Sequence, residues 1–255
     1  MKFLSAYHTD IGIKKSTNQD SLLIKIANTS YGNIGIFAIC DGMGGLSSGE
    51  LASSSVIKGL SKWFEENFPK LLLKENLYEE VEISLKQYIR FANSQICNYG
   101  KENDLKLGTT ITVMIIINQE YIIAHVGDSR AYNIGESLVR ITKDQSFVQR
   151  EIDLGNITEE QARNHKKKNL LLQCVGVTPT IEILTYKGNI KPGTVYLLCT
   201  DGLYHKVTEK ELVNNLNGSK FQTETQMKQM SIRLIDLVKQ RKEIDNISMI
   251  LVKII

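Results

Sequence analysis

The sequence predicts an α+β domain in which helices cover the outer faces of packed, largely antiparallel sheets. Short apolar runs rich in isoleucine, valine and tyrosine recur along the chain, and two long helical segments separate the second run from the third. Brief polar connections such as Asn118-Gln119 and Gly135-Glu136 join successive runs. Connections that short are typical of antiparallel hairpins, whereas parallel strands need long crossovers.

The apolar runs are typical of strands because β-branched residues favour a pleated, buried surface. Apolar residues three or four positions apart predict two long helices, from Ala52 to Trp63 and from Leu77 to Ile96. Thr158 and Thr208 are predicted N-caps of shorter helices, and Ser47 or Ser48 could cap the first long one. The predicted strands cover 21–26, 34–40, 110–117, 120–126, 130–134, 181–186, 194–199 and 247–254, and the further helices 146–154, 158–164, 208–216 and 223–240.

Composition predicts one globular domain over residues 1–255, since 42% of the residues are hydrophobic and only three are proline. No linker or internal repeat interrupts the pattern. Residues 135–180 differ because polar and charged residues dominate there, and we expect a surface flap. An ordinary solvent-exposed helical insertion would have the same composition.

Charge and cysteine usage exclude several classes of function. A net charge of +3 is too small to favour nucleic acid or an anionic membrane as a partner. The four cysteines are far apart and form no CxxC pair, so we expect them to be reduced and buried, without zinc. No long apolar segment predicts a leader or a membrane span, and no heptad pattern predicts association. We therefore expect a cytoplasmic monomer.

Five aspartates stand where an apolar run begins or ends: Asp20, Asp41, Asp128, Asp201 and Asp245. Each alone is an ordinary turn residue, because Asp-Gly and Asp-Asn pairs are common in turns. Strand ends can converge at one rim, however, and gathered carboxylates need hard divalent cations to offset their repulsion. Oxygen ligands favour magnesium or manganese over zinc.

Such a site predicts phosphoester hydrolysis, because two metal ions can activate a shared water and hold a phosphoryl group for in-line attack. The chain has no convincing serine or cysteine nucleophile triad. The glycine-rich stretch from Asp41 to Gly45 would let the backbone approach a metal or phosphate closely. It lacks the residues of a nucleotide-binding loop.

Six short motifs, in order, resemble the metal-dependent protein phosphatases of the protein phosphatase 2C (PPM) type, particularly their compact bacterial branch. The resemblance spans essentially the whole chain and implies a four-layer αββα sandwich with a metal centre at one end. The motifs are Asn18-Gln19-Asp20-Ser21, Phe37 to Gly45, Gly108-Thr109-Thr110, Ala124 to Arg130, Leu198 to Gly202, and Asp245-Asn246-Ile247-Ser248.

The resemblance also implies a role for each matching residue. Asp41 would bridge two Mn²⁺ or Mg²⁺ ions, with the Gly42 carbonyl on one of them. Asp201 and Asp245 would complete the shell of the second ion. Asp20 would act nearby through water, Asp128 with Asp201 would support a weaker third ion, and Asn246 would orient the ligand before it.

Several positions depart from the family pattern. Lys15 replaces a common arginine, so substrate phosphate would meet a point charge in place of a bidentate fork. Lys15 could also be a surface lysine. Gln19 replaces a glutamate and removes one negative charge, and Gln145 replaces a histidine near the flap. Neither Met43 nor Leu46 can donate the proton that a histidine supplies in some members. His125, inside an apolar run, is expected to be a hydrogen-bonded core residue.

The predicted function is that of a serine/threonine protein phosphatase, with Asp41, Asp201 and Lys15 as its catalytic residues. Its partners would be phosphorylated proteins, including substrates of a cognate serine/threonine kinase. A catalytically weak or inactive phosphoprotein-binding pseudophosphatase is the alternative, which only Lys15 and Gln19 favour. A metal-dependent nuclease or small-phosphoester hydrolase is a third reading, disfavoured by the missing basic groove.

Overall fold

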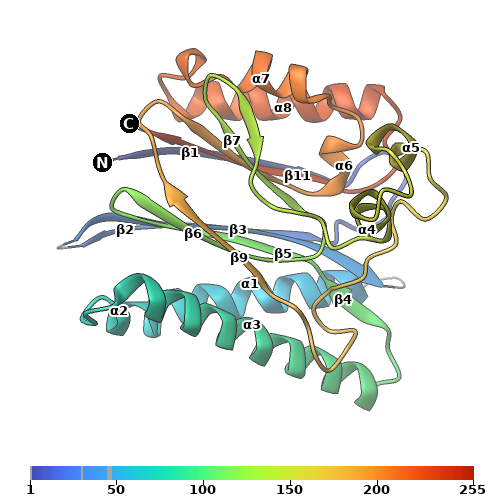
Figure 1. The fold of residues 1–255 in the computed structure, drawn as a ribbon, viewed down its shortest axis with the longest axis horizontal. Coiled ribbons are helices and arrows are strands. Elements are labelled where there is room, and N and C mark those ends of the chain that lie inside the picture. The colour runs from blue at the N-terminus through green and yellow to red at the C-terminus, as the bar shows by residue number, and fades with distance from the viewer. Residues whose placement is uncertain (1, 30, 45–47) are drawn as a thin grey trace.

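The computed structural model describes residues 2–29, 31–44 and 48–255. Two antiparallel sheets pack face to face, and helices cover the outer face of each (Figure 1). The order of layers is therefore helix, sheet, sheet, helix. This arrangement confirms both the predicted α+β class and the αββα sandwich that the resemblance implies.

The first sheet brings the two ends of the chain together, because Phe3 in its first strand pairs with Ile254 in its last. The strand over residues 3–10 escaped prediction. It lies at the edge of the sheet and buries only Phe3 and Ala6, so its sequence contains no continuous apolar run. In spatial order the strands are β1 (Phe3–Asp10), β11 (Ile247–Ile254), β10 (Val195–Cys199), β7 (Arg130–Ile134) and β8 (Leu138–Arg140).

The second sheet contains the longest strands, and its last strand begins later than predicted. The apolar run at 181–186 includes Ile181 and Ile183, which pack against the helix-side core from a loop. The hydrogen-bonded strand starts only at Leu184. The order is β2 (Asp20–Thr29), β3 (Gly32–Gly44), β5 (Ile111–Ile117), β6 (Glu120–Val126) and β9 (Leu184–Asn189), with β4 (Leu107–Thr109) paired to the end of β3.

Two of the shorter helices begin at their predicted caps. Thr158 and Thr208 are the N-caps of α5 and α7, as predicted, and each also forms a capping box. The first long helix begins at Ser48, and Ser47 lies outside the described residues. No described helix is long and apolar enough to cross a membrane. Helices α1 (Ser48–Glu66), α2 (Phe68–Leu71) and α3 (Leu77–Glu102) cover the second sheet, and α6 (Asp201–Tyr204), α7 (Glu209–Leu216), η1 (Gly218–Lys220) and α8 (Glu224–Gln240) cover the first.

Three apolar layers separate the four structural layers. Strand β3 contributes to two of them because successive side chains point to opposite faces. Ile36 and Ala38 face the helices α1 and α3, whereas Phe37 and Ile39 face the first sheet. All four cysteines are free and buried, as predicted.

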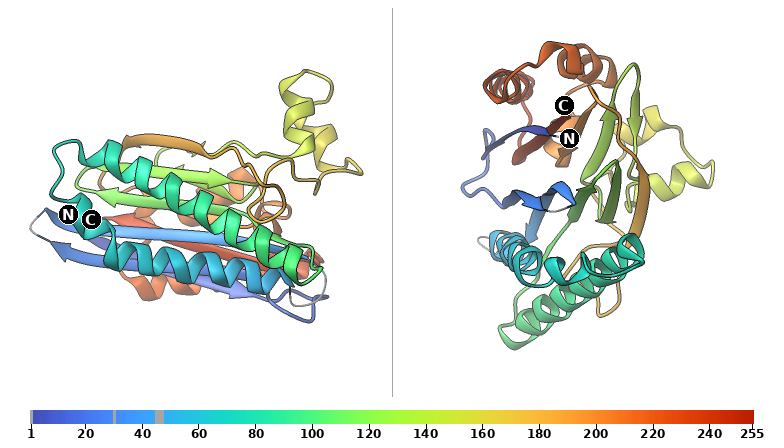
Figure 2. Two further views of the ribbon diagram at one scale, coloured as in Figure 1. Left: turned by 90° about the horizontal axis from the view of Figure 1, so that it is seen from below. Right: turned by 90° about the vertical axis from the view of Figure 1, so that its left-hand side faces the viewer.

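A flap projects from one end of the sandwich (Figure 2). It consists of residues 146–171, carries α4 (Phe147–Asp153) and α5 (Glu159–Arg163), and is closed by a bridge between Ser146 and Leu171. The flap is shorter than the predicted 135–180. Residues 138–140 belong to the first sheet, and Val175 is tied to Thr109.

A partly exposed ion-pair cluster attaches α3 to β9. Lys187 Nζ lies 2.6 Å from one carboxylate oxygen of Glu82, and the Thr185 hydroxyl donates to the other at 2.9 Å. Lys86 on the next helical turn also pairs with Glu82. Burial alone would raise the pKa of Glu82, but the hydrogen bonds from Lys187, Lys86 and Thr185 lower it from 4.5 to about 2.

We expect Glu82→Gln to lower the free energy of unfolding by about 1–2 kcal/mol at neutral pH. A depressed pKa means that ionised Glu82 stabilises the fold above pH 4.5 and that this contribution is lost as pH falls toward 2. Urea unfolding at neutral pH and near pH 3 would measure the difference. Glu79→Gln, on the exposed face of α3, is the control. A difference independent of pH would contradict the prediction.

Candidate metal centre

The five predicted aspartates lie near one another, close enough for the charges of the other four to act on Asp41. Asp20 opens β2 and pairs in register with Asp41 near the end of β3. Asp201 follows β10 as the first residue of α6, and Asp245 precedes β11. Asp128 lies in the turn between β6 and β7, which crosses from one sheet to the other. Asp41 lies within the electrostatic field of all four others.

The backbone of Asp41 is held by the Gly-Thr-Thr motif. The Thr109 hydroxyl and the Thr110 backbone N–H both donate to the Asp41 carbonyl at 2.9 Å. The Asp41 N–H donates in turn to the Thr110 hydroxyl at 2.9 Å. Every polar group of the Asp41 backbone thus faces this motif, which leaves its side chain as the group presented to the site.

The side chain of Asp20 is held from the opposite sheet. The Thr200 hydroxyl, from the end of β10, donates to Asp20 Oδ2 at 3.1 Å and accepts the Ser248 N–H at 3.0 Å. Ser248 also shares a 2.7 Å hydrogen bond with Thr9. The roles of Thr200 and Ser248 were not predicted from the sequence, although both residues belong to family motifs. Their positions beside Asp201 and Asn246 were the only available signal.

Burial and mutual repulsion disfavour the ionised form of this cluster. Desolvation raises the pKa of Asp41 well above its ordinary value, and the fields of Asp20, Asp201, Asp128 and Asp245 raise it further. Desolvation likewise raises the pKa of Asp20 to about 7 and that of Asp128 well above normal. The charges are unfavourable unless a cation offsets them.

Two buried carboxylate oxygens indicate that the aspartate cluster suits a cation. Asp20 Oδ1 and Asp201 Oδ1 are buried and have no hydrogen-bond partner among the described residues. An orphaned buried carboxylate oxygen is costly, and hard divalent cations are its natural partners. In the described ranges no three His, Cys, Asp or Glu side chains already lie close enough to form a ready ligand set. The donor chemistry nevertheless fits magnesium or manganese, which water molecules also help to coordinate.

Lys15 lies at the edge of this cluster. Its Nζ is 2.7 Å from Asp245 Oδ1, and its side chain is 41% exposed. Burial opposes the charge, but the hydrogen bond to Asp245 and the fields of Asp41 and Asp201 raise the Lys15 pKa. Lys15 is thus a largely exposed lysine whose ammonium group pairs with Asp245, one of the five aspartates.

Asn246 holds the loop that carries Lys15. Its Oδ1 accepts the Gln19 N–H at 2.9 Å, and its Nδ2 donates to the carbonyls of Ile11 at 2.9 Å and Thr17 at 3.1 Å. Only its backbone N–H reaches Asp245, at Oδ1. The expected orienting role thus differs from the observed one, because the side chain clamps residues 11–19 and does not contact the preceding aspartate's carboxylate.

Gly42 permits a close backbone approach, but to protein and not to an open site. A Cβ at Gly42 would lie 2.2 Å from the Gly49 carbonyl and 2.5 Å from the Gln19 carbonyl. The Gly42 N–H donates to that Gln19 carbonyl at 3.1 Å. Gln19 also packs against Gly49 at the start of α1. Met43 lies on β3, whereas Gly45 and Leu46 lie outside the described residues.

A network of charged and aromatic side chains around Arg130 supports the backbone of Asp128. It was not predicted from the sequence. Arg130 makes a bidentate pair with Asp144, with Nη2 to Oδ2 at 2.7 Å and Nε to Oδ1 at 3.0 Å. The guanidinium also lies 3.6 Å from the ring centre of Tyr204, whose hydroxyl donates to the Asp128 carbonyl at 3.1 Å. The network links the base of the flap to Asp128 and α6.

Gln145 and His125 have structural roles. Gln145 Oε1 accepts the Gly127 N–H at 2.9 Å, and Nε2 donates to the Glu182 carbonyl at 3.0 Å, which joins the flap base to the Asp128 turn. His125 is fully buried between the Thr112 hydroxyl and the Gly127 carbonyl. Burial lowers its pKa to about 4, which confirms a neutral core histidine.

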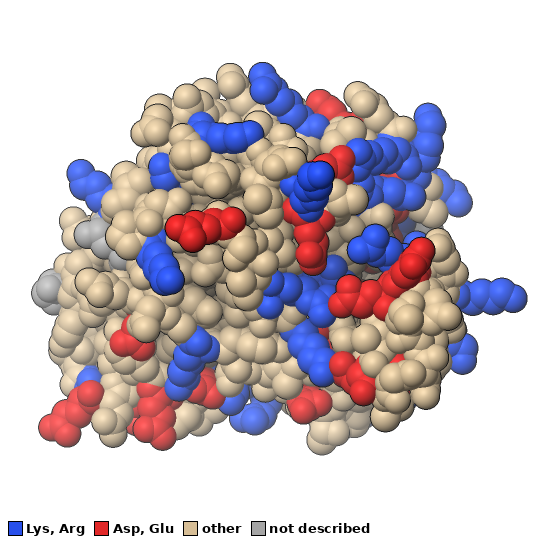
Figure 3. Space-filling view, turned by 45° about the horizontal axis from the view of Figure 1, so that its top comes forward, with Lys and Arg blue, Asp and Glu red and all other residues tan. Residues whose placement is uncertain are grey.

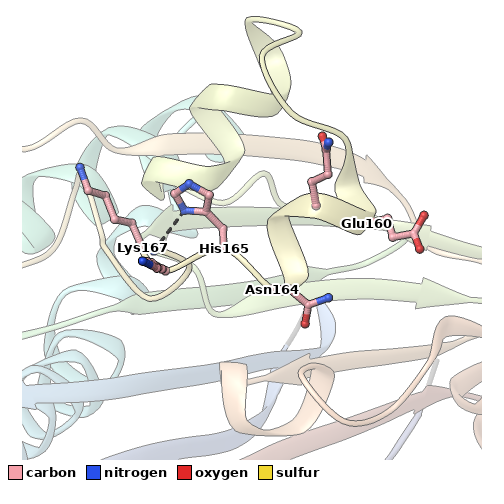
Figure 4. Close-up of a pocket in the computed structure, with 6 residues that line it drawn as sticks. Glu160, Asn164, His165 and Lys167 are labelled. Carbon is pink, nitrogen blue, oxygen red and sulfur yellow. Dashed lines mark hydrogen bonds between the residues drawn. The ribbon is translucent and has the colours of Figure 1, made fainter.

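Two further histidines were not assigned a role from the sequence, His205 near Asp201 and His165 in the flap. His205 Nδ1 is 3.8 Å from Asp201 Oδ2, a proximity that the sequence could not assign. His165 stacks on Phe147, and its Nδ1 accepts the Lys167 N–H at 3.1 Å (Figure 4). Figure 4 also shows Glu160 and Asn164 beside it, in a shallow depression that none of the five aspartates lines.

Comparison with known proteins identifies similar bacterial chains. The model of the family described as protein phosphatase 2C matches residues 12–247. The serine/threonine phosphatase stp of Listeria monocytogenes is 35% identical over 188 residues, which cover 72% of this chain and 73% of the relative. The solved serine/threonine phosphatase of S. agalactiae is 28% identical with a TM-score of 0.86 and covers 100% of both chains. The catalytic domain of PstP, solved with two manganese ions, is 28% identical with a TM-score of 0.79 over 98% of this chain and 97% of that one.

We expect Asn246→Ala to release residues 11–19 from the sandwich. Losing its side-chain hydrogen bonds should lower the free energy of unfolding by about 1–3 kcal/mol and accelerate amide hydrogen exchange in that loop. Asn246→Asp keeps the acceptor for the Gln19 N–H but loses both donations, so its effect should differ from that of alanine. If amides of residues 11–19 exchange at wild-type rates in the alanine variant, the Asn246 side chain does not hold this loop in place.

Proposed function

The chain belongs to the protein phosphatase 2C family, and we propose that it is a metal-dependent serine/threonine protein phosphatase whose metal centre is the aspartate cluster. The convergence of five carboxylates with two orphaned buried oxygens is the observation that supports this function most. It hydrolyses phosphoserine and phosphothreonine esters in other proteins. The pseudophosphatase alternative is disfavoured because the sequence retains all five aspartates that the family resemblance implies as ligands.

We assign the ligands as follows. Asp41 would hold both core ions, a role that the family resemblance implies and that the fields of the other four carboxylates on Asp41 support. Gly42 would contribute its carbonyl, and Asp201 and Asp245 would hold the second ion. Asp20 would act through water, with its Oδ2 held by Thr200 and its Oδ1 left for the site. Asp128, next to Asp201 electrostatically, would support a third, weaker ion.

The ions would be Mn²⁺ or Mg²⁺, which accept carboxylate, carbonyl and water oxygens. A relative with a matching fold, the PstP catalytic domain, was solved with two manganese ions. When bound, such ions activate water for in-line attack and offset the phosphoryl charge. The protein's own contribution is the rigid placement of carboxylates by Thr109, Thr110 and Thr200, which avoids reorganisation during the reaction.

Lys15 would hold the phosphate of the substrate. Lys15 is cationic at neutral pH, its hydrogen bond to Asp245 and the fields of Asp41 and Asp201 favour that charge further, and the Asn246 hydrogen bonds to residues 11–19 hold the loop that carries it. A flexible ammonium group forms a weaker phosphate contact than an arginine fork. Lys15 should therefore contribute mainly to substrate binding.

The substrates we propose are phosphoproteins made by a cognate serine/threonine kinase, so that the enzyme reverses kinase signalling. The four buried free cysteines are compatible with a reducing cytoplasm. No feature of the described surface calls for a nucleic acid, a membrane or a second copy of the chain, and we propose that it acts as a monomer.

Asp41→Asn should separate loss of activity from loss of folding. We expect Mn²⁺-dependent hydrolysis of p-nitrophenyl phosphate and of a phosphothreonine peptide to fall by at least about 100-fold. With chelator present, however, the variant should unfold at a higher urea concentration than the wild type, because folding raises the pKa of Asp41 and its charge is unfavourable near neutral pH. Mn²⁺ should reverse that order of stability by binding the folded wild type.

The same experiment decides between enzyme and binding module. If the folded wild type binds Mn²⁺ but cleaves neither substrate, the pseudophosphatase alternative replaces our proposal. If Asp41→Asn retains full activity, the cluster is not the metal centre.

Lys15→Ala should raise KM for the phosphothreonine peptide about tenfold with little change in kcat. Lys15→Arg should bind the peptide at least as well as the wild type, because a guanidinium can form a bidentate phosphate contact. Lys14→Ala changes the neighbouring exposed lysine and controls for general loss of positive charge. Equal KM values for Lys14→Ala and Lys15→Ala would refute the assignment.

A further inference from the structure

A second cavity lies between the flap and the helical layer of the first sheet. Its volume is about 390 Å³, enough for one or two side chains. The walls come from α4 and α5 on one side and from the segment joining α6 to α7 on the other. Much of its lining is charged. The charged residues are Asp128, Arg130, Arg140, Asp144, Glu159, Arg163, Lys168, Lys206 and Glu209, and Tyr204 lies among them.

Four of the lining residues, Arg130, Arg140, Asp144 and Tyr204, contact one another and are called the floor of this flap cavity. Arg130 pairs with Asp144 and stacks on Tyr204, so neither ion is available to a ligand. Arg140 is only partly engaged, since it donates to Gln149 at 3.1 Å and lies 3.9 Å from Asp144. The floor therefore supplies shape more than charge.

The rim carries cations without partners. Arg163, Lys168 and Lys206 line the cavity, and none of them forms an ion pair with any described residue. Two carboxylates, Glu159 and Glu209 in the first turns of α5 and α7, also line the cavity and offset part of this positive charge. Figure 3 shows Lys and Arg side chains gathered on the right-hand side of the molecule, where the flap meets these helices. The cavity has a surplus of positive charge.

The cavity opens beside the metal centre. Asp128 belongs to its lining, and Tyr204 on its floor donates to the Asp128 carbonyl. His205, also in the lining, is the neighbour of Asp201. An extended peptide advances about 3.3 Å per residue, so a segment of a few residues next to the phosphorylated one is long enough to span the distance between neighbouring subsites of this kind.

We propose that the flap cavity binds an acidic side chain of the protein substrate, a carboxylate or a second phosphate, that lies within a few residues of the phosphorylated one. This inference rests on the proposed phosphatase function and names the class of substrate sequence that the enzyme prefers. Three unpaired cations at a preformed cavity beside the reacting centre carry it. Arg163, Lys168 and Lys206 are positioned to contact the acid, and a guanidinium can do so through two hydrogen bonds.

The test compares phosphothreonine peptides that differ only near the phosphothreonine. One set carries glutamate, another a phosphonate analogue of phosphoserine that cannot be hydrolysed, and a third glutamine at each of the positions within three residues on either side. We expect kcat/KM of the wild type to be about 5–10-fold higher for the best glutamate or phosphonate peptide than for its glutamine counterpart. The difference should appear in KM and should shrink at high salt. A larger gain from the phosphonate than from glutamate would identify the second phosphate as the preferred acid.

Variants locate the effect. The triple variant Arg163→Gln, Lys168→Gln, Lys206→Gln should lose the preference for acidic peptides and keep the wild-type kcat/KM for p-nitrophenyl phosphate, which is too small to reach the cavity. Lys166→Gln is the matched control, because Lys166 belongs to the same flap but lines the depression of Figure 4 and not this cavity. It should retain the preference.

Two results would overturn the inference. One is equal kcat/KM for acidic and glutamine peptides at every position, and the other is a preference that persists unchanged in the triple variant. Failure of the phosphatase function itself is distinguishable, since the wild type would then hydrolyse no p-nitrophenyl phosphate with Mn²⁺.

Discussion

The repulsion among carboxylates buried between the two sheets is the constraint around which this end of the molecule is organised. Asp20 and Asp41 face each other across adjacent strands, and Asp201 and Asp245 reach them from the opposite sheet. Without cations the fold gains nothing from this cluster, because burial and like charge both disfavour ionisation. The arrangement persists because the large apolar layers elsewhere hold the strand ends in place. The carboxylates therefore lower the stability of the fold at this site, where a metal ion would need oxygen ligands.

The surrounding polar groups act on the backbone and on single oxygens and leave the charges largely uncompensated. Thr109 and Thr110 grip the Asp41 backbone, and Thr200 holds one oxygen of Asp20. Lys15 is the one lysine or arginine that forms an ion pair with any of the five aspartates in the described ranges. A site that neutralised its own carboxylates would have no affinity for divalent ions. This incomplete compensation therefore connects the electrostatics of the fold with metal-dependent catalysis.

Most of the fold could be predicted because the apolar pattern is strong where strands and helices are buried. Strand β3 and helix α3 were recognisable, since their apolar residues face a core along their whole length. Strand β1 was not, because an edge strand with two buried residues has no such pattern. The predicted start of strand β9 was too early because Ile181 and Ile183, which pack on the core, belong to a loop. The five aspartates were recognisable by their positions at strand ends and by their motifs, whereas Arg130, Asp144 and Tyr204 are far apart in sequence and carry no common signal.

Local pattern and motifs read in order were enough to predict the class of fold, the family, most of the buried strands and helices, and the five aspartates as candidate ligands. Only the packing of the sheets and the flap settles which groups meet. It placed Lys15 on Asp245, turned the Asn246 side chain toward residues 11–19, and set unpaired cations around a cavity beneath the flap. These contacts join residues up to hundreds of positions apart. Their geometry follows from how two twisted sheets and a flap pack together, and no local pattern encodes such packing.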